Sequence, residues 1–216
     1  MTLHAALRYF PLTGRPRPAC GPLAGRVAEV TAITLAVRHP GADIQWEAAH
    51  ALNKAALIAS DCGDPDLARA LCWRHITAYT ETGRPLTIRE ARCILEPTLN
   101  LARLAVRSGA FTAALELLDG IHQAITFSRD LVVEGSVLPL GGITGTRDQH
   151  RQLREWAWLQ HITEGIRAHV LADDWPAAVA HAERHPRGLD VKLRGQIDGC
   201  FPSVARRFPR RRGCGS

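Results

Sequence analysis

Histidine and cysteine are the residues of this 216-residue chain best suited to chemistry, because imidazoles and thiolates bind metals and act as bases or nucleophiles. Helical spacing puts Cys72 beside His75, and His181 beside His185. A zinc site needs a third and usually a fourth ligand at a comparable spacing, and none follows either pair. The His-Glu-x-x-His motif of zinc peptidases is also absent. We therefore expect no metal and no other cofactor.

The sequence also gives little evidence for a catalytic nucleophile or a phosphate-binding loop. Cys62 adjoins Asp61 at a predicted helix end, where the helix dipole raises the pKa of a thiol. The glycines of residues 141–145 lack the Gly-Lys-Ser/Thr element of a phosphate loop. The sequence therefore names no catalytic residue, although an enzyme with an unrecognised site stays open.

The basic residues concentrate at the two ends of the chain. The whole sequence has a net charge of +6, yet residues 43–186 hold 14 Arg or Lys against 18 Asp or Glu. The body is therefore mildly acidic, and residues 200–216 are predicted to be a disordered Arg-rich tail, the one part expected to reach nucleic acid. Nearly all basic residues are Arg, a bias typical of GC-rich genomes, so we expect an actinobacterium-like source.

The hydropathy of the sequence predicts no membrane-spanning segment. No stretch approaches the roughly 18 apolar residues of a membrane span. Residues 1–24 are rich in Pro and Gly and lack the apolar run of a secretory signal. The sequence predicts an irregular segment over residues 1–24, a cytoplasmic location and no membrane partner.

Apolar residues recur every three or four positions between residues 25 and 199, which predicts one all-α domain. Asp64–Pro65, and Thr87 with Glu90, are helix-start signals. Pro97 predicts either a kink or a new first turn. Residues 130–146 differ: they are β-branched and glycine-rich, and Glu134–Gly135 predicts a small hairpin or ordered loop.

Three windows of the chain align with one another: residues 52–72, 98–118 and 162–182. Each predicts a helix with small residues at its centre, a tight turn, and an Ala four or five residues after the turn. The anchors of the three turns are Gly63 with Ala68, Gly109 with Ala114, and Asp173 with Ala178. Small residues let two helices approach closely, and neither helix buries its apolar stripe alone, so the pattern predicts stacked helix pairs.

This pattern resembles the tetratricopeptide repeat (TPR) over residues 43–186. The resemblance implies stacked antiparallel helix pairs in a superhelix, with the 130–146 segment as an insertion. The units lie 46 and then 64 residues apart rather than 34, and Asp173 stands where the family has Gly. Ala59, Ala105 and His169 fill positions that are usually aromatic. An irregular helical bundle remains the alternative fold.

In proteins of the TPR class, the first helices of successive pairs line a groove that holds a peptide or partner helix. Projecting that face onto this chain gives a predicted binding surface. Its Arg guanidinium groups suit carboxylates, and its Asn amides suit peptide backbone. Its residues are Asn53, Leu57, Ser60, Leu99, Asn100, Arg103, Thr163 and Arg167.

The resemblance implies a protein- or peptide-binding module, an accessory or scaffold protein in an actinobacterial pathway, whose ligand is an acidic or C-terminal peptide. Two alternatives stay open: a peptide-modifying enzyme with its site in the groove, and a regulator acting with a DNA-binding partner. Self-association is a further expectation, because the short stack has few capping features.

Overall fold

The computed structural model describes residues 21–36, 44–81 and 83–184. In those residues the chain forms seven helices and one two-stranded sheet. The elements are α2 (Leu23–Ala36), α3 (Ile44–Asp61), α4 (Pro65–Thr80), α5 (Ile88–Arg107), α6 (Phe111–Phe127), β1 (Leu131–Val133), β2 (Ser136–Leu138), α7 (Arg147–Leu171) and α8 (Trp175–Glu183). The predicted all-α class is confirmed, and α2 begins two residues before the predicted start of the domain. The predicted tail and residues 185–199 lie outside the described residues.

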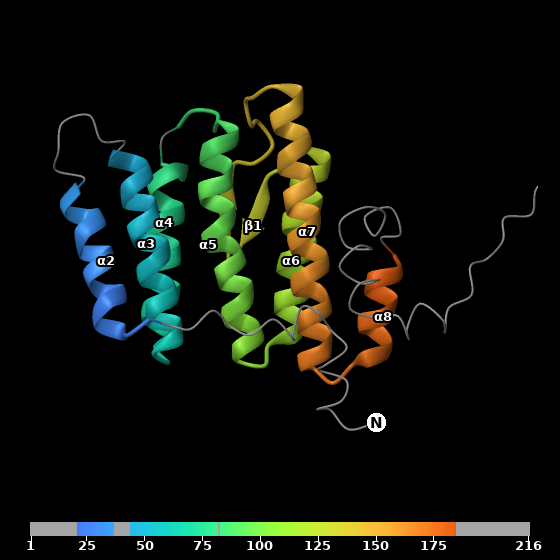
Figure 1. Ribbon diagram of the computed structural model, residues 1–216. Helices are drawn as coiled ribbons and strands as arrows, with labels where there is room; N and C mark the ends of the chain where they lie inside the picture. The colour runs from blue at the N-terminus through green and yellow to red at the C-terminus, as the bar shows by residue number, and fades with distance from the viewer. Residues whose placement is uncertain (1–20, 37–43, 82, 185–216) are drawn as a thin grey trace, which may run out of the picture.

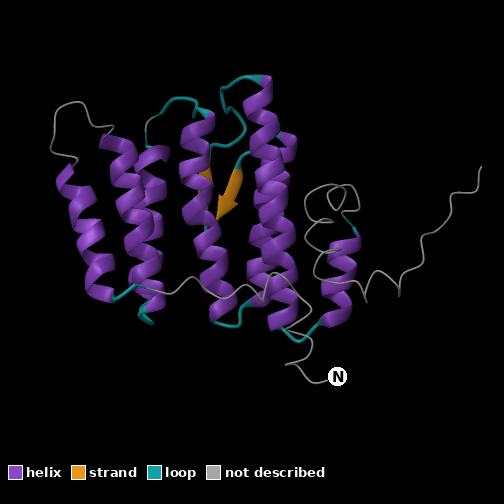
Figure 2. Cartoon of the chain, in the orientation of Figure 1, coloured by secondary structure: helices purple, strands orange, loops and turns teal. Residues whose placement is uncertain are grey.

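Consecutive helices pack against each other and run in opposite directions (Figure 1). The helices α3, α5 and α7 also contact one another, so they form one layer. Behind this layer lie α4 and α6, with the small sheet between them (Figure 2). No helix in the described part of the chain is long and apolar enough to cross a membrane.

Three helix pairs share the same turn. Gly63, Gly109 and Asp173 each have a positive φ, and the residue after each donates its backbone N–H to the carbonyl five residues earlier, at 2.9 Å. This is the Schellman arrangement that ends helices, and Asp is one of the few non-glycine residues that adopt its left-handed backbone. The aligned alanines after the turns, Ala68, Ala114 and Ala178, are at most 1% exposed.

Side chains at the helix starts satisfy the first free N–H groups. Asp64 accepts from the Leu67 N–H at 3.0 Å, and Thr87 forms a capping box with Glu90, as the sequence predicts. A second capping box, which sequence reasoning missed, joins Thr146 and Gln149 at the start of α7. Pro97 lies inside the continuous helix α5, so it starts no new helix.

The segment at 130–146 forms the predicted hairpin. Leu131–Val133 pairs antiparallel with Ser136–Leu138, and Glu134 and Gly135 both have positive φ, as a two-residue type I′ turn requires. The Glu134 carboxylate accepts from Trp73 Nε1 at 2.9 Å and pairs with Arg69 at 2.5 Å. Both partners lie on α4, so the hairpin joins α4 to α6.

The glycine-rich residues after the hairpin are pinned to the start of α5. The Thr144 N–H donates to the Leu86 carbonyl at 2.7 Å, and the Ile88 N–H donates to the Thr144 carbonyl at 3.1 Å. Gly145 packs so closely that a Cβ there would overlap the Ile88 side chain. Gly145 therefore allows this close approach of the loop to α5.

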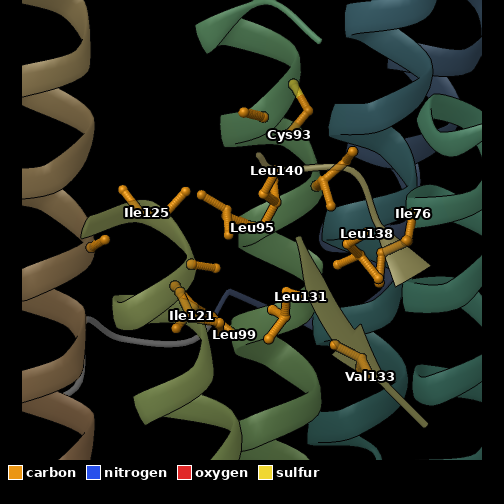
Figure 3. Packing of buried hydrophobic residues seen from close by; sticks show 14 of the residues in the cluster. Ile76, Cys93, Leu95, Leu99, Ile121, Ile125, Leu131, Val133, Leu138 and Leu140 are labelled. Atoms are coloured by element: carbon orange, nitrogen blue, oxygen red, sulfur yellow. The ribbon is translucent and has the colours of Figure 1, made fainter. Parts of the chain in front are cut away.

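The main hydrophobic core lies between the two layers (Figure 3). Side chains from α4, α5 and α6 meet the inward side chains of the hairpin there. The largest fully buried ones include Ile76, Ile94, Leu95, Leu118, Ile121, Leu138 and Leu140. A second, smaller cluster joins α7 to α8 through Ile162, Ile166, Val170 and Ala178.

Candidate functional site

The layer of α3, α5 and α7 brings together predicted site residues that are far apart in the sequence. Asn53 comes from α3, Asn100 and Arg103 come from α5, and Thr163 and Arg167 come from α7. These five residues span more than a hundred positions of the chain. They share one surface because the three helices contact each other in order.

Asn100 links α3 to α5. Its amide Nδ2 donates to Asn53 Oδ1 at 2.7 Å, and its own Oδ1 accepts from Arg103 Nη1 at 3.0 Å. The Asn100 side chain is buried, so these bonds satisfy polar atoms that water does not reach. The interaction therefore fixes Asn53, Asn100 and Arg103 relative to one another.

Glu164 links α5 to α7, and sequence reasoning missed it. Arg103 Nε and Nη2 both lie 2.7 Å from Glu164 Oε1, and Arg167 Nη1 lies 3.5 Å from Glu164 Oε2. Gln160, one turn earlier on α7, accepts from Arg103 Nη2 at 3.5 Å. The sequence did contain a signal for this site: Gln160, Glu164 and Arg167 follow one another at spacings of four and three, which places them on one face of a helix.

We call Asn53, Asn100, Arg103, Gln160, Glu164 and Arg167 the polar network. Two arginines share one carboxylate in it, so the network carries excess positive charge. The side chains of Arg103 and Arg167 are about one-third exposed, whereas that of Glu164 is largely covered. The cations therefore face solvent and the carboxylate lies beneath them.

A second ionic cluster continues the same surface toward the turn after α3. Arg107 hydrogen-bonds Ser60 Oγ and donates from Nη2 to Asp61 Oδ1 at 3.1 Å, while Arg26 from α2 reaches Asp61 Oδ2 at 3.1 Å. Partial burial alone would raise the pKa of Asp61, but the hydrogen bonds from Arg107 and Arg26 outweigh it and hold that pKa below its usual range.

Two of the predicted residues, Leu99 and Thr163, take roles other than open ligand contacts. Leu99 is 2% exposed and packs in the main core, so its expected place on the binding surface is not met. Thr163 Oγ1 donates to the Leu159 carbonyl of its own helix at 2.8 Å. Leu57, at 37% exposed, is the predicted apolar residue that reaches solvent.

A cluster of four imidazoles occupies the junction of α6, α7 and α8. His122 stacks on His161 with ring centroids 4.7 Å apart, and His181 lies 4.7 Å from His161 and 5.6 Å from His169. His161 Nε2 donates to Asp119 Oδ1 at 2.5 Å. The sequence paired His181 with His185, which lies outside the described residues.

The histidine cluster is built for packing rather than for ligation. His181 Nε2 donates to the His161 carbonyl at 3.2 Å, which commits that nitrogen to the backbone. Burial, with repulsion from His161, His169 and Arg184, lowers the pKa of His181 to about 4, so its ring is neutral at pH 7. No group of three or more His, Cys, Asp or Glu in the described residues has the geometry to hold a metal ion.

The two buried cysteines, Cys72 and Cys93, hold their protons tightly. Burial raises the pKa of Cys72 to about 11 and also raises that of Cys93, so both thiols stay protonated at neutral pH. Both are buried in the core, whereas Cys62 is exposed. Within the described part of the chain, the polar network is the arrangement that joins predicted site residues from three helices.

Comparisons of the chain with models of protein families, with curated proteins and with solved structures find no match.

Proposed function

We propose that this chain is a protein- or peptide-binding module of the TPR-like helical-repeat class, with α3, α5 and α7 presenting the ligand surface. One observation carries the proposal: these three first helices lie side by side and join predicted site residues through the polar network. The shared turn geometry at Gly63, Gly109 and Asp173 supports equivalent helix pairs.

The charges of the surface favour an acidic segment or a C-terminal carboxylate as the ligand. Arg103, Arg107 and Arg167 are each about one-third exposed, and they share the carboxylates of Glu164 and Asp61. A guanidinium group offers donors in a planar fork that matches a carboxylate. A ligand carboxylate would accept from the guanidinium N–H groups that do not bond Glu164 or Asp61.

Arg167 is the arginine to change first. It lies at the edge of the polar network and its contact with Glu164 is 3.5 Å long, so its loss leaves the Arg103–Glu164 pair intact. Arg103, in contrast, also orders Asn100, and its replacement would disturb α5 itself. Arg151 is a matched control, because it lies on the same helix and pairs at i,i+3 with Asp148.

The test is selection of peptides with free C-termini from a displayed random library on the whole purified chain, followed by affinity measurement for the enriched sequences. We expect acidic or carboxyl-terminal motifs, and about 10-fold weaker binding for Arg167→Gln, the loss of roughly one charge-assisted hydrogen bond. Arg151→Gln should bind as the unchanged chain does. No enrichment, or equal binding by all three proteins, would reject the proposal.

A further inference from the structure

The outer face of α2 is an apolar surface at one end of the row of helices. In Figure 1, α2 stands at the end of the row opposite α8, with α3 beside it. The side chains on this face form one continuous shallow surface: Leu23, Ala24, Val27, Ala28, Thr31, Ala32 and Leu35. Leu23, Val27 and Leu35 are each about half exposed, which is unusual for three large apolar side chains in one line.

The charges of α2 all turn away from this face. The helix carries two charged residues, Arg26 and Glu29. Arg26 pairs with Asp61, and Glu29 accepts from Lys54 Nζ at 2.8 Å, so both reach toward α3. Burying the outer face would therefore leave no charged side chain of α2 without a partner.

Thr31, the one polar side chain of the face, is already satisfied. Its hydroxyl donates to the Val27 carbonyl of the same helix at 3.0 Å. A hydroxyl bonded within its own helix can be buried without losing a hydrogen bond. Covering the face would therefore remove apolar surface from water and leave no polar group unpaired.

The order of side chains along the face reads almost the same in both directions. From Leu23 to Leu35 it runs Leu, Ala, Val, Ala, Thr, Ala, Leu, and Val and Thr have nearly the same shape. A twofold interface requires one patch to be complementary to itself. When two copies of α2 lie antiparallel, Leu23 meets Leu35 of the second copy, Val27 meets Thr31, and Ala28 lies near the axis.

We propose that the outer face of α2 is the interface of a twofold dimer, in which two copies of α2 pack antiparallel. The alanines between the larger side chains allow the two helices to approach closely. A 14-residue helix is about 21 Å long and about 10 Å wide, so α2 alone buries on the order of 400 Å² per copy. The total of about 800 Å² is less than a stable interface buries, so the dimer is weak and forms only at high protein concentration.

The first test is sedimentation of the whole chain from low-micromolar to submillimolar concentration. We expect a reversible monomer–dimer equilibrium that Val27→Glu abolishes, because it would bury two carboxylates near the axis. Val132→Glu is the matched control, since Val132 is also an exposed valine, on the hairpin. A chain that stays monomeric throughout the range, or a dimer that Val27→Glu leaves unchanged, would overturn the proposal.

Disulfide cross-linking then tests the antiparallel arrangement, in a background where Cys20, Cys62, Cys200 and Cys214 are Ser. Ala28→Cys should form a covalent dimer with itself. Leu23→Cys should cross-link to Leu35→Cys in a mixture but not to itself. Cross-linking of Leu23→Cys to itself would mean parallel helices and reject this interface. Failure of either experiment leaves the peptide-binding surface on α3, α5 and α7 untouched.

Discussion

Gly165 sets how closely α7 and α8 approach each other. It is buried in α7, and the ring of His181 from α8 occupies the space where a Cβ would stand. That position of the ring allows His181 Nε2 to donate to the His161 carbonyl. The missing side chain therefore makes room for a buried imidazole and its hydrogen bond.

We expect Gly165→Ala to lower the free energy of unfolding by about 1–2 kcal/mol, because overlap with the His181 ring outweighs the better helix propensity of Ala. His181→Ala removes the ring, so the double variant should recover most of that loss. Urea unfolding of the four proteins gives the coupling energy between the two positions. Strictly additive effects would show that His181 does not fill the space beside Gly165.

Sequence projection found some members of the polar network but not its orientation. Asn53, Asn100 and Arg103 contact one another, yet Leu99 points into the core. Neighbouring residues of a helix point in directions about 100° apart. An error of one position in assigning the exposed face therefore places a core residue on the surface. Glu164 was missed in the same way, because the projected face included its neighbour Thr163 instead.

At the scale of elements, α8 is attached to the fold mainly through α7. Their shared hydrophobic cluster is small, and His181 on α8 is buried beside α7. His161 and His169 on α7 lie against the His181 ring, and Arg184 after α8 adds its charge nearby. His161 in turn contacts His122 and Asp119 on α6. Protonating His181 while α8 stays docked would place its charge among these groups.

Acid should therefore release α8 before the rest of the fold. The pKa of His181 is about 4 when α8 is docked, against about 6.5 in water, so docking loses stability as pH falls from about 6.5 toward about 4. We expect hydrogen exchange of the α8 amides to gain roughly 10-fold in opening equilibrium between pH 7 and pH 5, about 1–2 kcal/mol.

The control for this release is His181→Gln, which cannot take up the proton. Its α8 amides should show no such gain, after correction for the pH dependence of intrinsic exchange. His50→Gln, on the exposed side of α3, should behave as the unchanged chain does. An equal pH response in His181→Gln would assign the effect to another group.

Element boundaries were well predicted where a local rule governs them. The Glu134–Gly135 turn, the Thr87 capping box and the Gly63 and Gly109 helix ends all follow from backbone preferences of single residues. The extent of α7, from Arg147 to Leu171, also follows from its local periodicity. The placement of the hairpin between α4 and α6 was not predicted, because it depends on contacts between segments distant in the sequence, such as Glu134 with Trp73.

At the scale of the whole molecule, the hairpin explains why the aligned units are unevenly spaced. Leu131, Val133 and Leu138 are buried in the main core, where they fill space between α4 and α6. The third unit therefore begins later in the sequence without a break in the layer of α3, α5 and α7. The three-window alignment depends on spacing within each helix pair and not on spacing between pairs, so the inserted hairpin does not disturb it.

His75 makes the stability of the whole molecule depend on pH. Its ring is 2% exposed, and among the described residues neither of its nitrogens has a hydrogen-bond partner. Burial lowers the pKa of His75 to about 4. The unfolded chain binds a proton at about pH 6.5 and the folded chain does not, so the free energy of unfolding falls as pH drops from about 6.5 to about 4.

We expect His75→Leu to raise the free energy of unfolding by about 1 kcal/mol at pH 7, since it removes two buried, unsatisfied nitrogens at similar volume. Between pH 7 and pH 5 it should also remove about 2 kcal/mol of acid destabilisation. Urea unfolding followed by circular dichroism at both pH values measures these effects, with His50→Gln as control. If His75→Leu lost stability with acid as steeply as the unchanged chain, the buried ring would not be the source. Because His75 lies in α4, its effect must appear in global unfolding, whereas His181 acts on α8 alone, so the two variants separate global from local acid sensitivity.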